Sequence, residues 1–211
     1  MTKAAIFLAA LITLCSPFVS QAETAAPFRV ISPIFSQLVT FSMPAAFVAI
    51  SEGTNGPSYI REAILKGETL DRWTQMITVT GAKGATGNAG VSPQSFASSM
   101  AGGFKAACPD TFAAKPLGET RFGDREAFVA VAGCGRVATG ADAHSETTLI
   151  AVVKGSADYY TLQWAERAAP VDRPAVDDAK WPERLRLLQP ILLCPIVPGE
   201  AAPYPSCGGK N

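Results

Sequence analysis

Charge is scarce in this sequence, and neither sign is in excess. Only 17% of the 211 residues are charged, against about 25% in an average soluble protein, and 18 Lys and Arg balance 18 Asp and Glu. Because the basic residues form no stripe beside aromatic ones, we expect no nucleic-acid binding. Hydrophobic residues make up 48% of the chain, which is enough for a buried core and excludes an intrinsically disordered protein.

Long apolar runs are also missing beyond the first residues. The run Ala4–Leu14, of about 11 residues, is too short to span a bilayer, and Ser20 and Ala22 are small residues suited to signal-peptidase cleavage. Residues 1–22 are therefore predicted to be a secretory signal peptide cleaved after Ala22. The mature protein would then be periplasmic or secreted, without membrane insertion. Two alternatives remain open: an uncleaved membrane anchor, and a lipoprotein acylated at Cys15.

C-x-x-C pairs are absent, although the chain contains five cysteines. The predicted mature chain keeps Cys108, Cys134, Cys194 and Cys207. An even number of cysteines in an exported protein is typical of disulfides, and local arrangement favours Cys108–Cys134 and Cys194–Cys207 over the other two connectivities. The alternatives are a zinc site of four cysteines, or of three with His144, and a redox-active pair, although such sites normally use C-x-x-C spacing. We predict no metal site and no cofactor.

Catalytic motifs are absent as well. No G-x-S-x-G presents a nucleophile, and His144, the one histidine, adjoins Ser145 in a polar stretch. Neighbours in sequence seldom form a catalytic hydrogen-bond chain, so we interpret His144 as a loop residue and assign no catalytic residue. The alternative is an envelope hydrolase that uses His144 with Ser145 or a nearby acid. A separate set of carboxylates is interleaved with basic residues, which is typical of surface ion pairs. This set consists of Glu62, Glu68 and Asp71 among Arg61, Lys66 and Arg72.

Glycine recurs at every third position from Gly81 to Gly90, between a predicted strand and a predicted helix start. Backbone amides in that position can bind an anion, but the order G-x-x-x-x-G-K-[ST] of phosphate-binding loops is missing. We interpret the segment as a mobile surface loop.

Alternating apolar and polar residues predict strands along most of the mature chain. The predicted strands are 38–42, 46–51, 58–65, 76–80, 111–122, 127–132, 147–154 and 158–164. The last alternates strictly, with Tyr160, Leu162 and Trp164 on one face. Because turn dipeptides join many of these strands into hairpins, we expect the sheet to be antiparallel.

Two helices are predicted beside these strands. The first begins after Ser92, an N-cap followed by proline, and carries an apolar stripe that should face the sheet. The stripe consists of Phe96, Met100 and Phe104. The second helix is predicted over residues 178–189 and ends at a proline. In addition, Thr69 is expected to cap a short helical turn through Trp73.

These elements predict one α+β domain with short flanking segments. We expect a lead-in at residues 23–36, the domain at 37–192 and, at 193–211, a proline-rich tail that a disulfide staples on itself. The expected fold is a single antiparallel sheet of about six or seven strands with two main helices packed on it.

Part of the sequence resembles a known group of proteins. The run Phe41-Ser-Met-Pro44, the hairpin to Tyr59 and the segment from Lys66 to Val79 are similar to uncharacterised exported bacterial proteins with a PsbP-like α/β/α sandwich fold. The resemblance covers about residues 37–190 and implies an accessory or binding role without a shared catalytic set.

Aromatic residues are the remaining candidates for ligand contacts. With His144, the candidates are Tyr59, Trp73 and Trp164, although most strand aromatics are expected to be core residues. We therefore expect an exported, non-enzymatic accessory or binding protein. Its partner would be an envelope protein or a small ligand that the sequence does not identify. A purely structural, surface-associated protein is a further alternative.

Overall fold

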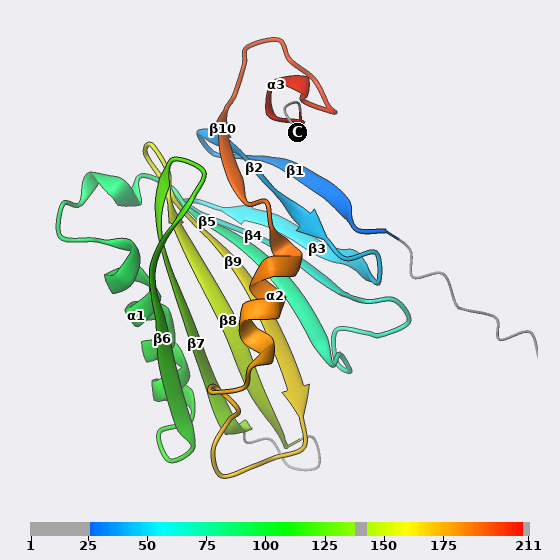
Figure 1. The fold of residues 1–211 in the computed structure, drawn as a ribbon, viewed down its shortest axis with the longest axis vertical. Helices are drawn as coiled ribbons and strands as arrows, with labels where there is room; N and C mark the ends of the chain where they lie inside the picture. The colour runs from blue at the N-terminus through cyan, green and yellow to red at the C-terminus, as the bar shows by residue number, and fades with distance from the viewer. Residues whose placement is uncertain (1–25, 138–142, 209–211) are drawn as a thin grey trace, which may run out of the picture.

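The main sheet of the protein contains seven antiparallel strands, in a computed structural model that describes residues 26–137 and 143–208 (Figure 1). The strand order is β3-β4-β5-β9-β8-β7-β6. The strands are β3 (Phe47–Asn55), β4 (Ser58–Leu65), β5 (Gln75–Ala82), β6 (Phe112–Phe122), β7 (Arg125–Val137), β8 (His144–Lys154) and β9 (Tyr159–Ala168). The predicted α+β class and antiparallel sheet are confirmed. The predicted signal peptide, with Cys15, lies outside the described residues.

The connections between strands decide which of them become neighbours. Strands β3, β4 and β5 form successive hairpins, and Gly56, with φ of 56°, begins the two-residue turn between Asn55 and Ser58. After β5 the chain crosses to the far edge of the sheet. The hairpins β6–β7–β8–β9 then lead back, so that Leu162 of β9 lies opposite Val79 of β5. Strands distant in sequence therefore form the centre of the sheet.

A second, three-stranded antiparallel sheet is not anticipated by the sequence. It has the order β1-β2-β10, with β1 at Phe28–Ile34, β2 at Gln37–Met43 and β10 at Leu192–Pro195. Strand β1 lies in the expected lead-in, and β10 lies where the tail was expected to begin. The two strands are not predicted from the sequence because they contain Pro33 and Pro195. Proline donates no ladder hydrogen bond and so argues against a strand assignment. Both strands are edge strands, where proline is tolerated.

Two main helices form where they were predicted. Helix α1 (Pro93–Ala107) begins with a capping box, in which the Ser92 side chain accepts from the Ser95 amide and the Ser95 hydroxyl accepts from the Ser92 amide. Helix α2 (Lys180–Leu188) confirms the second prediction within two residues at its start. The described residues also form a short 3-10 helix, η1 (Ala85–Gly87), and helix α3 (Pro205–Gly208).

The predicted helical turn from Thr69 to Trp73 is wrong. Thr69 and Arg72 instead form an isolated β-bridge. The Glu68 carboxylate accepts hydrogen bonds from the Thr74 amide and hydroxyl, and these bonds close the loop in a non-helical form. A side chain thus competes successfully with the helical backbone bonds that the capping pattern predicts.

The two faces of the main sheet are covered differently (Figure 1). Helix α2 and the small sheet cover one face, over a core that includes Phe41, Trp164 and Trp181. Helix α1 covers mainly the part of the other face formed by β6, β7 and β8, and Phe96 also stacks on Tyr159 at the start of β9. The apolar stripe of α1 packs on the sheet as predicted. Within residues 26–137 and 143–208, no helix is long and apolar enough to cross a membrane.

Both favoured disulfides are present. Cys108–Cys134 joins the end of α1 to β7, and Cys194–Cys207 joins β10 to α3. The second disulfide does more than close the tail on itself, because β10 pairs with β2 and so fastens the tail to the domain. Disulfides of this kind are typical of oxidising compartments outside the cytoplasm.

Candidate binding site

A line of depressions runs beside α1 on the partly covered face of the main sheet. Three adjoining depressions have volumes of about 580, 460 and 670 Å³, and neighbouring ones share lining residues. We call the central one, of about 460 Å³, the α1 groove. Its apolar lining includes Ile60, Leu70, Met76, Phe104 and Ala165. The volume lies within the range of about 300–1,000 Å³ that small-molecule sites occupy.

Polar side chains in two rows form much of the floor of the α1 groove. Glu62 of β4, Thr78 of β5 and Gln163 of β9 are direct cross-strand neighbours. In the next row, Thr80 and Thr161 share a hydrogen bond of 2.7 Å, and Gln163 Nε2 donates to Thr161 Oγ1 at 3.1 Å. Since neighbouring strands lie about 4.8 Å apart, the backbones of Glu62 and Gln163 are about 10 Å apart.

The polar floor begins where the cover of α1 ends. Ile150 of β8 lies opposite Gln163, yet it is fully buried and belongs to the core beneath α1. One strand further from the helix, Gln163 and Thr78 are half-buried and line the α1 groove. An uncovered sheet face is expected to carry polar side chains, and a covered one apolar side chains.

Thr148 of β8 is the exception to this division. It is only 2% exposed, but it lines the α1 groove beside the apolar Ala165 of β9. Its hydroxyl oxygen has no hydrogen-bond partner among the residues that the structure describes. A buried polar group without a partner costs about 1–3 kcal/mol, so this hydroxyl is a feature that packing alone does not explain.

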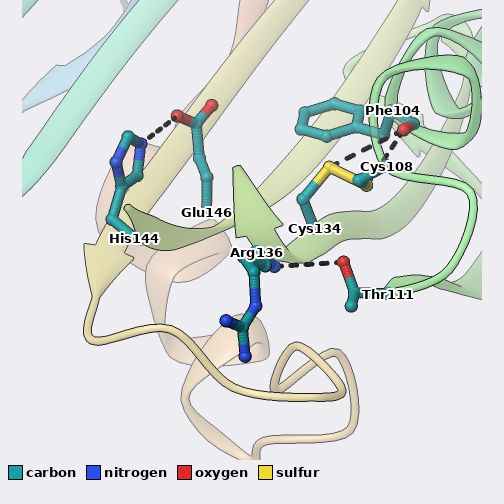
Figure 2. Close-up of a disulfide and its surroundings, with 7 residues drawn as sticks. All are labelled: Phe104, Cys108, Thr111, Cys134, Arg136, His144 and Glu146. Carbon is teal, nitrogen blue, oxygen red and sulfur yellow. Dashed lines mark hydrogen bonds and ion pairs between the residues drawn. A yellow bond between two sulfur atoms is a disulfide. The ribbon is translucent and has the colours of Figure 1, made fainter. Parts of the chain in front are cut away.

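Four side chains cluster at one end of the α1 groove. The Arg167 guanidinium lies 3.6 Å from the centre of the Trp73 ring, and Arg167 Nε donates to a Glu146 carboxylate oxygen at 3.1 Å. His144 Nε2 lies 3.8 Å from the same oxygen, and Figure 2 shows the His144 and Glu146 side chains pointing toward each other. The charge of Glu146 is therefore already balanced by Arg167, and the cluster lies where the α1 groove meets the adjoining depression of about 670 Å³.

The disulfide Cys108–Cys134 holds the helical wall of the α1 groove in place (Figure 2). Cys134 of β7 lies opposite Glu146 of β8, and Cys108 Sγ lies 3.0 Å from the carbonyl oxygen of Phe104. Phe104 itself lines the α1 groove. The disulfide thus anchors the last turn of α1 directly beside the polar floor.

The structure brings together two of the four sequence-based candidates and separates the other two. Trp73 and His144 line the same depression. Trp164 is 2% exposed on the opposite face, edge-on to Phe47 at 5.2 Å. Tyr59 is 6% exposed, and its hydroxyl donates to Glu52 at 2.8 Å; burial, with the Glu52 carboxylate, raises the pKa of Tyr59. Trp164 and Tyr59 are core residues, which matches the expectation for most strand aromatics.

The hydrolase alternative pairs His144 with Ser145 or a nearby acid. His144 does lie near the acid Glu146, but Ser145 does not join them. His144 and Ser145 are consecutive in β8, and consecutive strand residues point to opposite faces. Ser145 is buried, at 6% exposure. Among residues 26–137 and 143–208, no group of three or more His, Cys, Asp or Glu side chains is placed to hold a metal ion.

Sequence reasoning misjudged Glu62 and overlooked Thr148, Gln163 and Arg167. The expected ion pairs of Glu62, Glu68 and Asp71 with nearby bases are wrong for the part of the chain that the structure describes, since no pair among these residues lies within 4.0 Å. Arg61 instead points its guanidinium at Ser32, at 2.9 Å, on the other face. One residue could have indicated the candidate site from the sequence. Gln163 is a polar residue in a predicted strand that is otherwise typical of a buried core.

Hydrogen bonds fasten the start of the glycine-rich segment, which was expected to be a mobile surface loop. The Gly84 amide, at φ of 70°, donates to Asp158 Oδ1 at 2.7 Å, and the Lys83 amide donates to the Pro57 carbonyl at 2.8 Å. The loop amide does bind an anion, but the anion is a carboxylate of the protein itself. Asp158 is 1% exposed in the β8–β9 turn.

No protein-family profile matches the sequence, and no curated protein sequence is significantly similar to it. Among solved structures, the chain is similar to the Ran-binding protein Mog1p of Saccharomyces cerevisiae, with a TM-score of 0.46 and 11% identity over 79% of this chain and 96% of that one. It is also similar to a point mutant of the protein Mog1, with a TM-score of 0.44 and 11% identity over 69% of this chain and 79% of that one. At this level of identity and TM-score, these similarities indicate no specific family.

Proposed function

We propose that this chain is an exported, non-enzymatic binding protein whose ligand lies in the α1 groove. The residues 1–22 are its signal peptide, cleavage follows Ala22, and the mature protein acts in the periplasm or outside the cell. The observation that carries the binding role is the row Glu62, Thr78 and Gln163, three half-buried polar side chains on the floor of a depression between strands and a helix.

Three features support a preformed site. The floor belongs to the central strands of a seven-stranded sheet, which are the most rigid elements of such a fold. The wall is fastened by Cys108–Cys134, and one end is lined by the stacked pair Arg167 and Trp73. Rigid walls reduce the entropy lost on binding, so a site of this kind suits recognition of a small ligand.

A groove-blocking variant tests the proposal. Thr78→Trp places a large ring at the centre of the floor, and Thr120→Trp places the same ring at an exposed position of the edge strand β6. The mature, oxidised protein is titrated with a panel of amino acids, amines, sugars and short peptides, and backbone amide NMR shifts are followed. We expect at least one compound to shift amides of the α1 groove. Thr78→Trp should weaken that binding at least tenfold, whereas Thr120→Trp should leave it unchanged.

Two results would contradict the proposal. The first is a panel in which no compound shifts amides of the α1 groove, or in which Thr78→Trp and Thr120→Trp bind equally well. The second is a reproducible hydrolytic turnover that is lost in His144→Ala, which would show that the protein is an enzyme.

A further inference from the structure

Thr148 carries a hydroxyl that the fold does not use. Its neighbours on the same face include Ala165 on β9 and Ala132 on β7, and valine would fill the same space without a buried polar group. Thr148 lines the α1 groove, and its buried hydroxyl oxygen has no partner among the described residues. This hydroxyl is therefore available to exchange a hydrogen bond with a ligand.

Glu62 carries the charge that the α1 groove leaves unbalanced. It is half-buried, and no base of the described residues lies within 4.0 Å of its carboxylate, whereas Glu146 in the same groove is paired with Arg167. Its neighbours on β4 in the same face are Ile60 and Ile64, which offer it no hydrogen bond. A partly desolvated carboxylate favours a positively charged partner.

The lining between these two groups limits the shape of the ligand. Ile60 and Leu70 are 42% and 55% exposed at the rim, so an apolar segment of a ligand has surface to cover. Glu62 lies on β4 and Thr148 on β8, with β5 and β9 between them. Thr148 also lies two residues along β8 from Ile150, which is in the row of Glu62. Three strand spacings of about 4.8 Å and this offset of about 7 Å separate the two backbones by about 16 Å, and the length of both side chains shortens the span that a ligand must bridge.

We propose that the α1 groove binds a small organic cation, with an amine or guanidine at Glu62, a short apolar chain over the floor, and a neutral polar group at Thr148 and Gln163. This assignment rests on the proposed binding function. The class of ligand follows from charge complementarity at Glu62 and from the unused hydroxyl of Thr148 at the other end. Gln163 uses one amide hydrogen for Thr161, which leaves its second amide hydrogen and its carbonyl oxygen for the ligand.

A matched pair of probes tests the charge. N-acetylputrescine has an amine, a four-carbon chain and a neutral amide, and N-butylacetamide is the same molecule without the amine. Both are titrated into the mature, oxidised protein, with backbone amide NMR to locate binding and determine Kd. We expect N-acetylputrescine to shift amides of the α1 groove and to bind at least tenfold more tightly than N-butylacetamide. Added salt should weaken its binding, because the Glu62 contact is only partly buried.

Matched variants test the two residues. Glu62→Gln should weaken N-acetylputrescine binding at least tenfold, and Glu119→Gln, an exposed glutamate on β6, should not change it. Thr148→Val should weaken it about fivefold to tenfold, Thr148→Ser should preserve it, and Thr147→Val, on the opposite face of β8, should have no effect. Thermal unfolding of each variant establishes that it is folded.

The outcomes separate this inference from the proposed function. Equal affinity for the two probes, an unchanged Kd in Glu62→Gln, or no shift in the α1 groove with N-acetylputrescine overturns the cation assignment. If a neutral compound then binds in the α1 groove and Thr78→Trp blocks it, the binding function stands without the cation.

Discussion

Asp158 shows how a single side chain joins three loops of this protein. Its carboxylate accepts hydrogen bonds from the Ser36 amide and hydroxyl in the β1–β2 turn and from the Gly84 amide in the glycine-rich loop. The Tyr160 hydroxyl lies 3.0 Å from the same carboxylate. Burial raises the pKa of Asp158, but the hydrogen bonds to Ser36, Gly84 and Tyr160 outweigh it, and the pKa lies below its ordinary value of 3.8.

Replacing Asp158 by asparagine should therefore destabilise the protein at neutral pH. The amide cannot accept the same set of charge-assisted bonds, and we expect Asp158→Asn to lower the free energy of unfolding by about 2–3 kcal/mol at pH 7. Urea unfolding monitored by tryptophan fluorescence measures the change. As a control, Asp110→Asn at an exposed position should change the free energy by less than about 0.5 kcal/mol.

The same carboxylate predicts a pH dependence with a definite sign. A folded pKa below the unfolded one gives stability that is complete above the unfolded pKa and is lost as the pH falls through the folded pKa. The difference in unfolding free energy between the protein and Asp158→Asn should be constant above about pH 5 and shrink below about pH 4. A difference that stays constant to pH 2 would contradict the role assigned to this carboxylate.

At the scale of elements, α1 depends on its disulfide more than its sequence implies. The helix contains Gly102 and Gly103 near its C-terminus, where glycine weakens a helix, and only part of its surface meets the sheet. Cys108–Cys134 compensates by tying the end of α1 to β7 beside the α1 groove. The capping box at the other end leaves the two ends of the helix independently fixed.

Removal of the two disulfides should have unequal effects. The double variant Cys108→Ser with Cys134→Ser should lose about 3 kcal/mol of unfolding free energy, and Cys194→Ser with Cys207→Ser about 0.6 kcal/mol less, because its loop is half as long. The sequence separations are 26 and 13 residues. Urea unfolding gives both values, and hydrogen exchange should show faster opening of α1 only in the first variant. A larger loss in the second variant would contradict this account.

At the scale of the whole molecule, the low charge of the chain makes its disulfides more important for keeping it folded. The predicted cleavage removes Lys3 and no acid, so the mature chain carries one more acid than bases and stays nearly neutral. Such a surface gives little electrostatic protection against association, so a closed core and covalent bridges carry more of the task of keeping the chain folded. The small sheet contributes to this closure, because β10 and α3 are fastened over β2 by pairing and by Cys194–Cys207.

The predicted signal-peptide cleavage and the two disulfides both change the mass of the exported protein. We expect the protein recovered from an extracytoplasmic fraction to begin at Glu23 and to contain two disulfides and no free thiol. Intact-mass measurement with and without reduction, followed by thiol counting in denaturant, checks both statements. Retention of Met1, an acylated Cys15 or four free thiols would each show that the predicted processing is wrong.

Local patterns in the sequence determine most of the elements. The alternation of Tyr160, Leu162 and Trp164 assigns one face of β9, and the cap at Ser92 starts α1. These signals are readable because neighbouring residues act within one strand or one helical turn. The small sheet was missed for the same reason: β10 is four residues long, carries Pro195, and forms only against β2 from the far end of the chain.

The candidate site was decided by tertiary structure. Glu62, Thr78, Thr148 and Gln163 come from four strands, and each is an ordinary polar residue in its own segment. They meet because the crossover after β5 brings β9 beside β5, and because α1 covers β6, β7 and β8 but leaves Gln163 of β9 and Thr78 of β5 half-buried. The sequence alone determined the strands, the helices and the favoured disulfides, since these depend on local pattern. Only the packing of the helix on the sheet decided which polar residues line a groove, because burial depends on what lies above a residue in space.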